Sequence, residues 1–128
     1  MNNYAEVFRK SSCSKEDINP GDIVFFDYAG DVSKECQTGR VKSFAGIVSD
    51  TAGFVLGGEG MEEEEEKVVI GLTGRVYVKT NRQFNPGDKV VAGKDGLAHK
   101  KRLIDFRPII GIACELNEDL SKVRVLIK

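Results

Sequence analysis

The sequence Asn-Pro-Gly-Asp occurs twice in this chain, at residues 19–22 and again at residues 85–88. Other residues match at this offset or one residue away from it: Gly30 with Gly96, Lys34 with Lys100, and Gly46-Ile47 with Gly111-Ile112. Matches at a fixed offset indicate that one structural motif is used more than once. The chain therefore contains two related units, and its fold must be one that two copies of a short motif can build.

Each copy of the motif predicts a turn that leads directly into a strand. Proline presets φ for the first central position of a type II turn, and glycine supplies the positive φ of the second. The elements expected in the two copies are apolar strands at 23–26 and 89–92, glycine-containing reversing turns at 29–31 and 94–96, and closing apolar strands at 44–48 and 109–114. Each unit is thus a hairpin followed by a returning strand.

The remaining segments also favour strands. Residues 75–79 and 122–128 alternate apolar and polar side chains, as half-buried strands do. Sustained helical spacing is absent, and only 14–17 and 116–121 suggest short helices. The pattern predicts an all-β domain, a small barrel or sandwich with little helix. Its expected parts are an opening segment at 1–18, unit one at 19–50, central strands and an acidic loop at 51–84, and unit two at 85–128.

Composition limits the classes of partner. Nineteen basic and twenty acidic residues give a net charge of -1, so no overall field attracts nucleic acid. Three separated cysteines (Cys13, Cys36 and Cys114) lack metal-ligand or redox spacing, and we expect reduced thiols and no metal site. No apolar stretch approaches the ~20 residues of a membrane span, so we expect a soluble cytoplasmic chain without membrane contact. We interpret the run Glu62–Glu66 as a solvated loop.

A short cationic strip is the first candidate binding site. It comprises His99, Lys100, Lys101 and Arg102, with Lys94 nearby, and such cations can hold a phosphate group. Solvated surface is the alternative, because no glycine-rich loop opens a helix that would cradle a nucleotide. His99 has no cysteine or carboxylate near it in the sequence that could prepare its imidazole for catalysis, and we expect it at the surface.

Glu6 is the second candidate. The common motifs of hydrolases are absent, which directs attention to single carboxylates. Strand periodicity places Tyr4, Glu6 and Phe8 on one face, where the two aromatic rings would remove part of the water around the carboxyl group. Partial desolvation suits a carboxyl group to general acid–base catalysis near neutral pH. A glutamate that points to water from an edge strand fits the same spacing.

The opening segment Asn3-Tyr4-Ala5-Glu6-Val7-Phe8 resembles the Asp-Tyr-Ala-Glu-x-Phe opening of a known domain family. This family is the C-terminal self-cleaving chaperone domain of tail-spike and neck-appendage proteins of Bacillus phages, which is classed among the glutamic peptidases. Further segments carry the resemblance along nearly the full length: 21–22, 45–49, 70–78, 86–88 and 110–113. The opening is the distinctive part, because glycine-punctuated strands are common in phage structural proteins.

The resemblance implies a specific activity. Such a domain helps three chains to assemble into a spike and then severs itself at the bond before the Asp-Tyr-Ala-Glu stretch. In this chain that bond would precede Asn3, and Glu6 would be the catalytic glutamate. Asn3 stands where the family has aspartate. The implied partners are two further copies, forming a homotrimer, and the upstream spike portion of the same polypeptide, in the host cytoplasm during virion assembly.

The resemblance also bears on cofactors. Cleavage requires none, but ATP is linked to release of the domain in this family, and the first residues to consider for ATP are Lys94, Lys100, Lys101 and Arg102. The main alternative is a non-catalytic β module that decorates or trimerises a phage structural protein, with Glu6 as a bystander. A phosphate- or nucleic-acid-binding barrel is a third interpretation, which the overall charge disfavours.

Overall fold

The computed structural model describes residues 3–12, 16–27, 29–34, 44–49, 54–57, 67–93 and 95–127, without the side chains of Asn3 and of 54–57. The strands are β1 (Asn3–Arg9), β2 (Ile23–Phe26), β3 (Val32–Ser33), β4 (Phe44–Val48), β5 (Phe54–Gly57), β6 (Lys67–Lys79), β7 (Lys89–Ala92), β8 (Ala98–Lys100), β9 (Ile109–Ala113) and β10 (Lys122–Ile127). The prediction of an all-β fold is confirmed. No apolar helix long enough to cross a membrane occurs in the described part of the chain.

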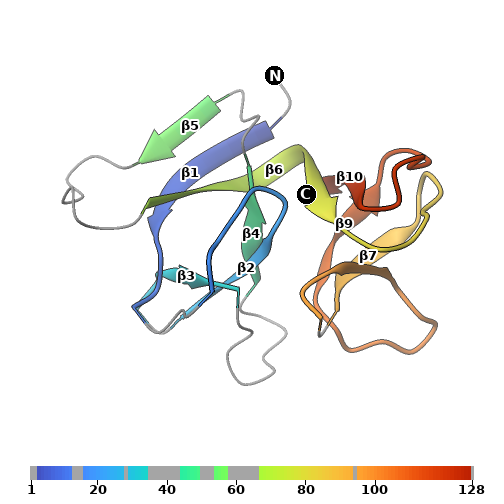
Figure 1. Cartoon of the computed structure of the whole chain (residues 1–128), viewed down its shortest axis with the longest axis horizontal. Coiled ribbons are helices and arrows are strands. Elements are labelled where there is room, and N and C mark those ends of the chain that lie inside the picture. Colours follow the sequence, from blue (N-terminus) through green and yellow to red (C-terminus); the bar gives the residue numbers. More distant parts are fainter. Residues whose placement is uncertain are drawn as a thin grey trace.

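The strands form one sheet that curls into a half-barrel (Figure 1). Its order is β3-β2-β4-β6-β10-β9-β7-β8, and β1 pairs with both β5 and β6. The long strand β6 joins the two sides: its first half pairs with β1 and β4, and its second half pairs with β10. The partner changes at Gly74, which has a φ of 91°. β6 is therefore a strand that belongs to both units.

Both Asn-Pro-Gly-Asp segments form the expected type II turn. Gly21 and Gly87 have φ values of 90° and 91°. In each turn the aspartate N–H donates to the asparagine carbonyl oxygen over 3.1 Å. The aspartate carboxylate in return accepts from the asparagine N–H, at 2.7 Å in the first turn and 2.8 Å in the second. The two turns are thus equivalent down to single hydrogen bonds.

The closing strands of the two units also match, including an irregularity. The register shifts after the pair Val24–Gly46 in β2–β4, and after the pair Val90–Gly111 in β7–β9. A Cβ added to Gly46 would lie 2.4 Å from the Gly71 carbonyl oxygen, and one added to Gly111 would lie 2.3 Å from that of Leu126. Glycine is needed at both bulges because the neighbouring strand approaches so closely.

The correspondence extends beyond the segments that match in sequence. Lys10 forms a parallel bridge with Val32, and Thr80 forms the same bridge with Ala98, which stands 66 positions after Val32. β1 therefore occupies the place in the first unit that the second half of β6 occupies in the second. The repeated structural unit begins with the strand before each turn, and the second unit begins inside β6.

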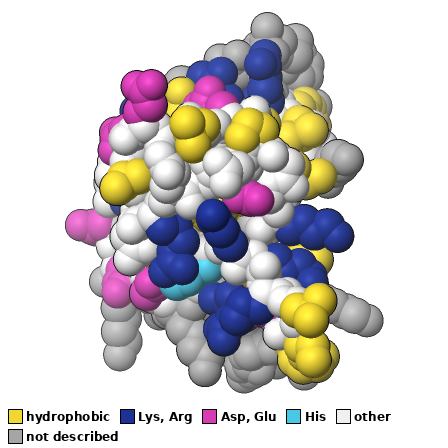
Figure 2. All heavy atoms as spheres, turned by 90° about the vertical axis from the view of Figure 1, so that its right-hand side faces the viewer, with side chains coloured by type: hydrophobic (Ala, Val, Ile, Leu, Met, Phe, Trp, Pro, Cys, Tyr) yellow, Lys and Arg dark blue, Asp and Glu magenta, His cyan; other side chains and the backbone are white. Residues whose placement is uncertain are grey.

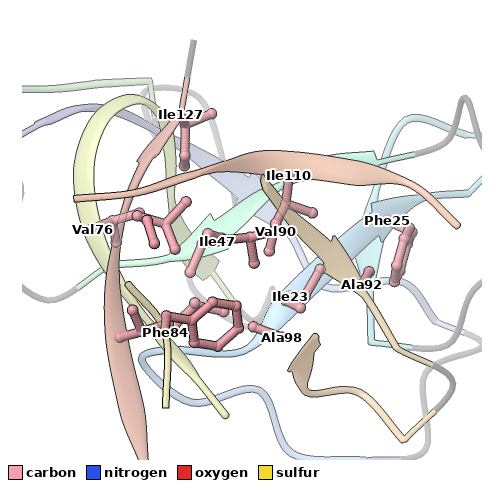
Figure 3. Close-up of a cluster of buried hydrophobic side chains, with 14 residues drawn as sticks. Ile23, Phe25, Ile47, Val76, Phe84, Val90, Ala92, Ala98, Ile110 and Ile127 are labelled. Atoms are coloured by element: carbon pink, nitrogen blue, oxygen red, sulfur yellow. The ribbon is translucent and has the colours of Figure 1, made fainter. Parts of the chain in front are cut away.

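The main hydrophobic core lies between the two units (Figure 3). The first unit contributes Ile23, Phe25 and Ile47, and the second contributes residues such as Val90 and Ile110. All five are between 0% and 5% exposed. Burying a large apolar side chain contributes about 1.5–3 kcal/mol, so this shared cluster is the main force that holds the units together.

A second apolar cluster covers the other side of the first unit. It contains Val24, Val32, Val48, Val68 and Ile70, with Phe8 and Phe26 packed against it. Because successive side chains of β2 point to opposite faces, that strand contributes alternately to the shared core and to this second cluster. Cover on both faces explains why 23–26 is a continuous apolar run without polar alternation.

The expectation of short helices is wrong wherever the structure describes those segments. Residues 116–121 form turns, and residues 16–17 are not helical. The Asn117 side chain, 5% exposed, donates from Nδ2 to the carbonyl oxygens of Asp119 and Lys122, both over 3.1 Å. Such bonds between a side chain and the nearby backbone compete with helical hydrogen bonds. Residues 14–15 lie outside the described residues.

Candidate active site

Glu6 lies in a strand that is paired on both sides. β1 runs parallel to β5 and antiparallel to β6, and these registers place Glu6 between Leu56 and Ile70. An edge strand would leave a row of backbone groups without partners. The alternative that places Glu6 on an edge strand is therefore wrong. The double pairing instead fixes the backbone from which the carboxylate projects.

The Glu6 side chain is half-buried beside the second apolar cluster. Residues directly opposite in an antiparallel pair share a face of the sheet, so Glu6 lies with Ile70, and Phe8 with Val68. Phe8 packs edge-to-face on Phe26, with ring centroids 5.6 Å apart. The Glu6 carboxylate has no hydrogen-bond or ion-pair partner in the part of the chain that the structure describes. It stands at the rim of an apolar cluster.

The backbone of Asn3 belongs to the same strand and pairs with Gly74 of β6. Asn3 and Glu6 are three positions apart, and an extended strand rises about 3.3 Å per residue. Their Cα atoms are therefore about 10 Å apart along the strand. The peptide bond before Asn3 lies further still from Glu6 of the same chain, which is beyond the reach of a glutamate side chain.

The predicted cationic strip does not converge on one point. Lys100 Nζ lies 3.5 Å from the Asp88 carboxylate and 5.9 Å from the centre of the Phe84 ring. Lys101 Nζ donates to the Arg102 carbonyl oxygen over 3.2 Å, and the Arg102 side chain is 74% exposed. Lys94 lies outside the described residues. The structure brings Lys100 to the second Asn-Pro-Gly-Asp turn, and leaves Lys101 and Arg102 in the loop that follows β8.

The interpretation of His99 as a histidine without a neighbouring carboxylate is wrong. Its Nε2 lies 2.9 Å and 3.0 Å from the two carboxylate oxygens of Asp95, four residues earlier across the β7–β8 turn. Burial raises the pKa of Asp95, but hydrogen bonds from the Leu97 N–H and from His99 outweigh it and leave that pKa below its ordinary value. The hairpin, which the sequence predicted, is what brings the two side chains together.

One buried network was missed in the sequence. The Asp22 side chain is 4% exposed, and its Oδ1 accepts from Lys79 Nζ over 2.7 Å, while Lys34 Nζ lies 3.5 Å from Oδ2. The network ties the first turn to the end of β6 and to the residue after β3. The repeated motif marked Asp22 as a turn residue, but only the fold shows that two lysines meet there.

The structure describes only one of the three cysteines that were singled out in the sequence. Cys13, Cys36 and the run Glu62–Glu66 lie outside the described residues. Cys114 is half-buried with a free thiol, and burial raises the pKa of that thiol. Among the described residues, no three histidine, cysteine, aspartate or glutamate side chains gather as metal ligands would.

Comparison with known proteins gives a structural match. No protein-family model matches the sequence, and no curated protein matches it either. The fold is similar to the crystal structure of the C-terminal fragment of bacteriophage phi29 gene product 12, with a TM-score of 0.66 and 17% identity, over 98% of this chain and 100% of that one. It is also similar to pre-mature phi29 gene product 12, with a TM-score of 0.67 and 16% identity, over 99% of this chain and 21% of that one. At these identities the match shows the fold.

Proposed function

We propose that this chain is a self-cleaving assembly chaperone for a phage appendage protein. In this proposal it supports trimer formation by an upstream spike portion in the host cytoplasm, and then cleaves the bond before Asn3 with Glu6 as the catalytic carboxylate. The observation that carries the proposal is the half-buried Glu6 in a doubly paired strand near the start of the chain. The fold supports it, since it is found both as a C-terminal fragment and as 21% of a longer pre-mature chain.

The chemistry assigned to Glu6 is general base catalysis of peptide hydrolysis. The carboxylate takes a proton from a water molecule, and the resulting hydroxide adds to the carbonyl carbon of Asn2. Collapse of the tetrahedral intermediate breaks the C–N bond, and the protonated Glu6 returns the proton to the departing nitrogen of Asn3. The products are a carboxylate at residue 2 and a free amine at residue 3. A nearby hydroxyl in place of water would give an ester that water then hydrolyses.

The geometry of β1 favours cleavage between chains. Glu6 lies about 10 Å along an extended strand from Asn3 of its own chain, whereas a general base must come within about 3 Å of the attacking group. A neighbouring copy in the proposed trimer can bring its Glu6 to the bond without disrupting the strand. Asn3 can orient that bond through its amide group, but unlike the aspartate of the family it cannot share a proton with Glu6.

The decisive experiment uses a longer chain that includes the residues encoded before Asn3. On a denaturing gel we expect the parent chain to yield two fragments, and Glu6→Gln to remain intact. Glu16→Gln, which changes an exposed glutamate outside β1, serves as the control and should cleave normally. Equal cleavage of the parent chain and Glu6→Gln would show that Glu6 is not catalytic, and would favour a non-catalytic β module.

Co-folding distinguishes the two routes of cleavage. A Glu6→Gln chain with a size tag is refolded together with untagged parent chain, and the tagged chain is followed on the gel. We expect the tagged chain to be cut, because a parent copy in the same trimer supplies the carboxylate. Tagged chain that stays intact while the parent is cut would show that Glu6 acts within its own chain.

ATP remains part of the proposal as a ligand that promotes release and is not required for cleavage. The residues to test are Lys100, Lys101 and Arg102, together with Lys94. Isothermal titration with ATP, and with Arg102→Ala as the comparison, tests this site. No heat of binding to the parent chain would remove ATP from the proposal.

A further inference from the structure

The loop between β8 and β9 exposes a group of large apolar side chains. Leu103, Ile104 and Phe106 are 96%, 77% and 82% exposed, more than any other large apolar residue in the described part of the chain. Residues 101–107 carry three cations and one carboxylate. In Figure 2, hydrophobic side chains project from the lower edge of this face beside a group of lysine and arginine side chains near the histidine. We call residues 101–107 the basic tip.

The basic tip is held in a defined shape by Asp105. The carboxylate of Asp105, 3% exposed, accepts hydrogen bonds from the N–H groups of Arg102 and Arg107 over 3.0 Å and 3.1 Å. The Arg107 guanidinium adds two more, at 2.9 Å and 2.7 Å. A loop ordered in advance loses less conformational entropy when it binds. The apolar side chains are therefore presented by a rigid support.

A second exposed apolar group lies in the turn between β9 and β10. Leu116 and Leu120 are 48% and 50% exposed. Residues 115–120 carry three carboxylates and no cation. Asn117 anchors this turn, because its Oδ1 accepts from the Phe84 N–H over 2.6 Å and its Nδ2 donates to three backbone carbonyl groups. We call residues 115–120 the acidic turn.

The basic tip and the acidic turn are complementary in both properties that matter for association. Each offers apolar side chains for burial, and their rims carry opposite charge. Within one copy they lie apart: in Figure 1 the turn between β9 and β10 lies in the upper part of the right-hand side, and the loop that leads from β8 to β9 lies in the lower part. They can therefore meet only between two copies.

We infer that the basic tip of one copy docks on the acidic turn of the next copy. This inference rests on the proposed trimer and names the surfaces that would build it. Because each copy offers one tip and one turn, the contact is head-to-tail, and such contacts close into a ring when the rotation from one copy to the next brings the last copy back to the first. A ring of three would use every tip and every turn. An anionic membrane would suit the basic tip alone, but it would leave the exposed apolar side chains of the acidic turn uncovered.

Sedimentation velocity of the full chain tests the contact through two single variants. Phe106→Ser removes an anchor of the tip and Leu120→Ser one of the turn, and each should raise the dissociation constant at least about tenfold. A mixture of the two variants retains one intact tip and one intact turn per pair, so it should form dimers and no trimer. Lys67→Glu, an exposed lysine outside both surfaces, should leave the mass unchanged.

Charge reversal and cross-linking make the test specific. Arg102→Glu should weaken association, and Glu118→Arg in the same chain should restore it. p-Benzoylphenylalanine in place of Phe106 should cross-link to residues 115–120 of another copy. Any one of four results would overturn the inference. Two concern association: a monomeric parent chain, or an unchanged mass in all variants. The other two are cross-links to residues outside the acidic turn, and binding to phosphatidylserine vesicles that depends on Phe106. If the parent is a trimer and only these variants have no effect, Glu6-dependent cleavage still stands and the contact alone is refuted.

Discussion

The repeat provides an internal control for the energetics of its own turns. Asp22 and Asp88 occupy the same position, and both accept a hydrogen bond from the asparagine three residues earlier. The Asp22 side chain is 4% exposed and lies between Lys79 and Lys34, whereas the Asp88 side chain is 31% exposed and lies 3.5 Å from a single lysine. Alanine at either position removes the same turn bond, but only Asp22→Ala removes a buried carboxylate.

The expected loss of stability follows from these contacts. The turn hydrogen bond contributes about 1 kcal/mol in both units. The 2.7 Å bond to Lys79 is charge-assisted and adds about 1.5–3 kcal/mol. Lys79 is 42% exposed and returns to water when Asp22 is removed, so we take the lower end of that range. The longer contact to Lys34 adds no more than about 1 kcal/mol. We therefore expect Asp22→Ala to lower the free energy of unfolding by about 3 kcal/mol, and Asp88→Ala by about 1 kcal/mol.

Equilibrium urea unfolding of both variants and the parent, at one protein concentration, measures this difference. A fixed concentration is needed because association would change the apparent stability. The m-values should agree, so that midpoints report stability directly. Equal losses in the two variants, or a larger loss for Asp88→Ala, would refute the idea that burial between two lysines makes the first turn the stronger one.

Three further outcomes are expected. Gly111→Ala should lower the unfolding free energy by about 1–3 kcal/mol, because its Cβ would lie 2.3 Å from the Leu126 carbonyl oxygen; a loss within error would contradict this close approach. Phe84→Ala should cost about 3–5 kcal/mol in the same urea assay, since the ring is fully buried in the shared core (Figure 3). The hydrogen bond from Arg107 holds the pKa of Asp105 well below its ordinary value of 3.8, so the stability that Asp105 contributes is complete above about pH 4 and is lost as the pH falls further. Asp105→Asn should therefore flatten the acid side of a stability–pH curve, and an unchanged curve would exclude Asp105 as a contributor.

Much of the fold follows from local chemistry. Proline and glycine in Asn-Pro-Gly-Asp prefer the dihedral angles of a type II turn wherever they occur, and both turns form as expected. Strand alternation has a period of two residues, which is why Glu6 and Phe8 could be assigned to one face, where they lie opposite Ile70 and Val68. The strands at 23–26, 44–48 and 89–92 have the predicted bounds, because each is a short apolar run in a segment marked by turn residues.

Other features depend on residues that are distant in sequence. In the turn that replaces the expected helix at 116–121, Asn117 bonds to the nearby backbone and also to the Phe84 N–H and the Arg82 carbonyl oxygen, more than thirty residues away. The cationic strip divides because Lys100 is drawn to Asp88 in the preceding turn. Neither partner can be recognised from the spacing of residues along the chain.

The amino-acid sequence by itself determined that this protein is a twofold β repeat with a glutamate near its start, because turn preference and strand periodicity act over a few residues. Only the tertiary structure decided that β6 is shared by both units, that Glu6 lies in a doubly paired strand, and that the basic tip and the acidic turn lie apart (Figure 1). The physical reason is that strand pairing, burial and charge contacts join segments far apart along the chain, and only their arrangement in space determines which segments meet.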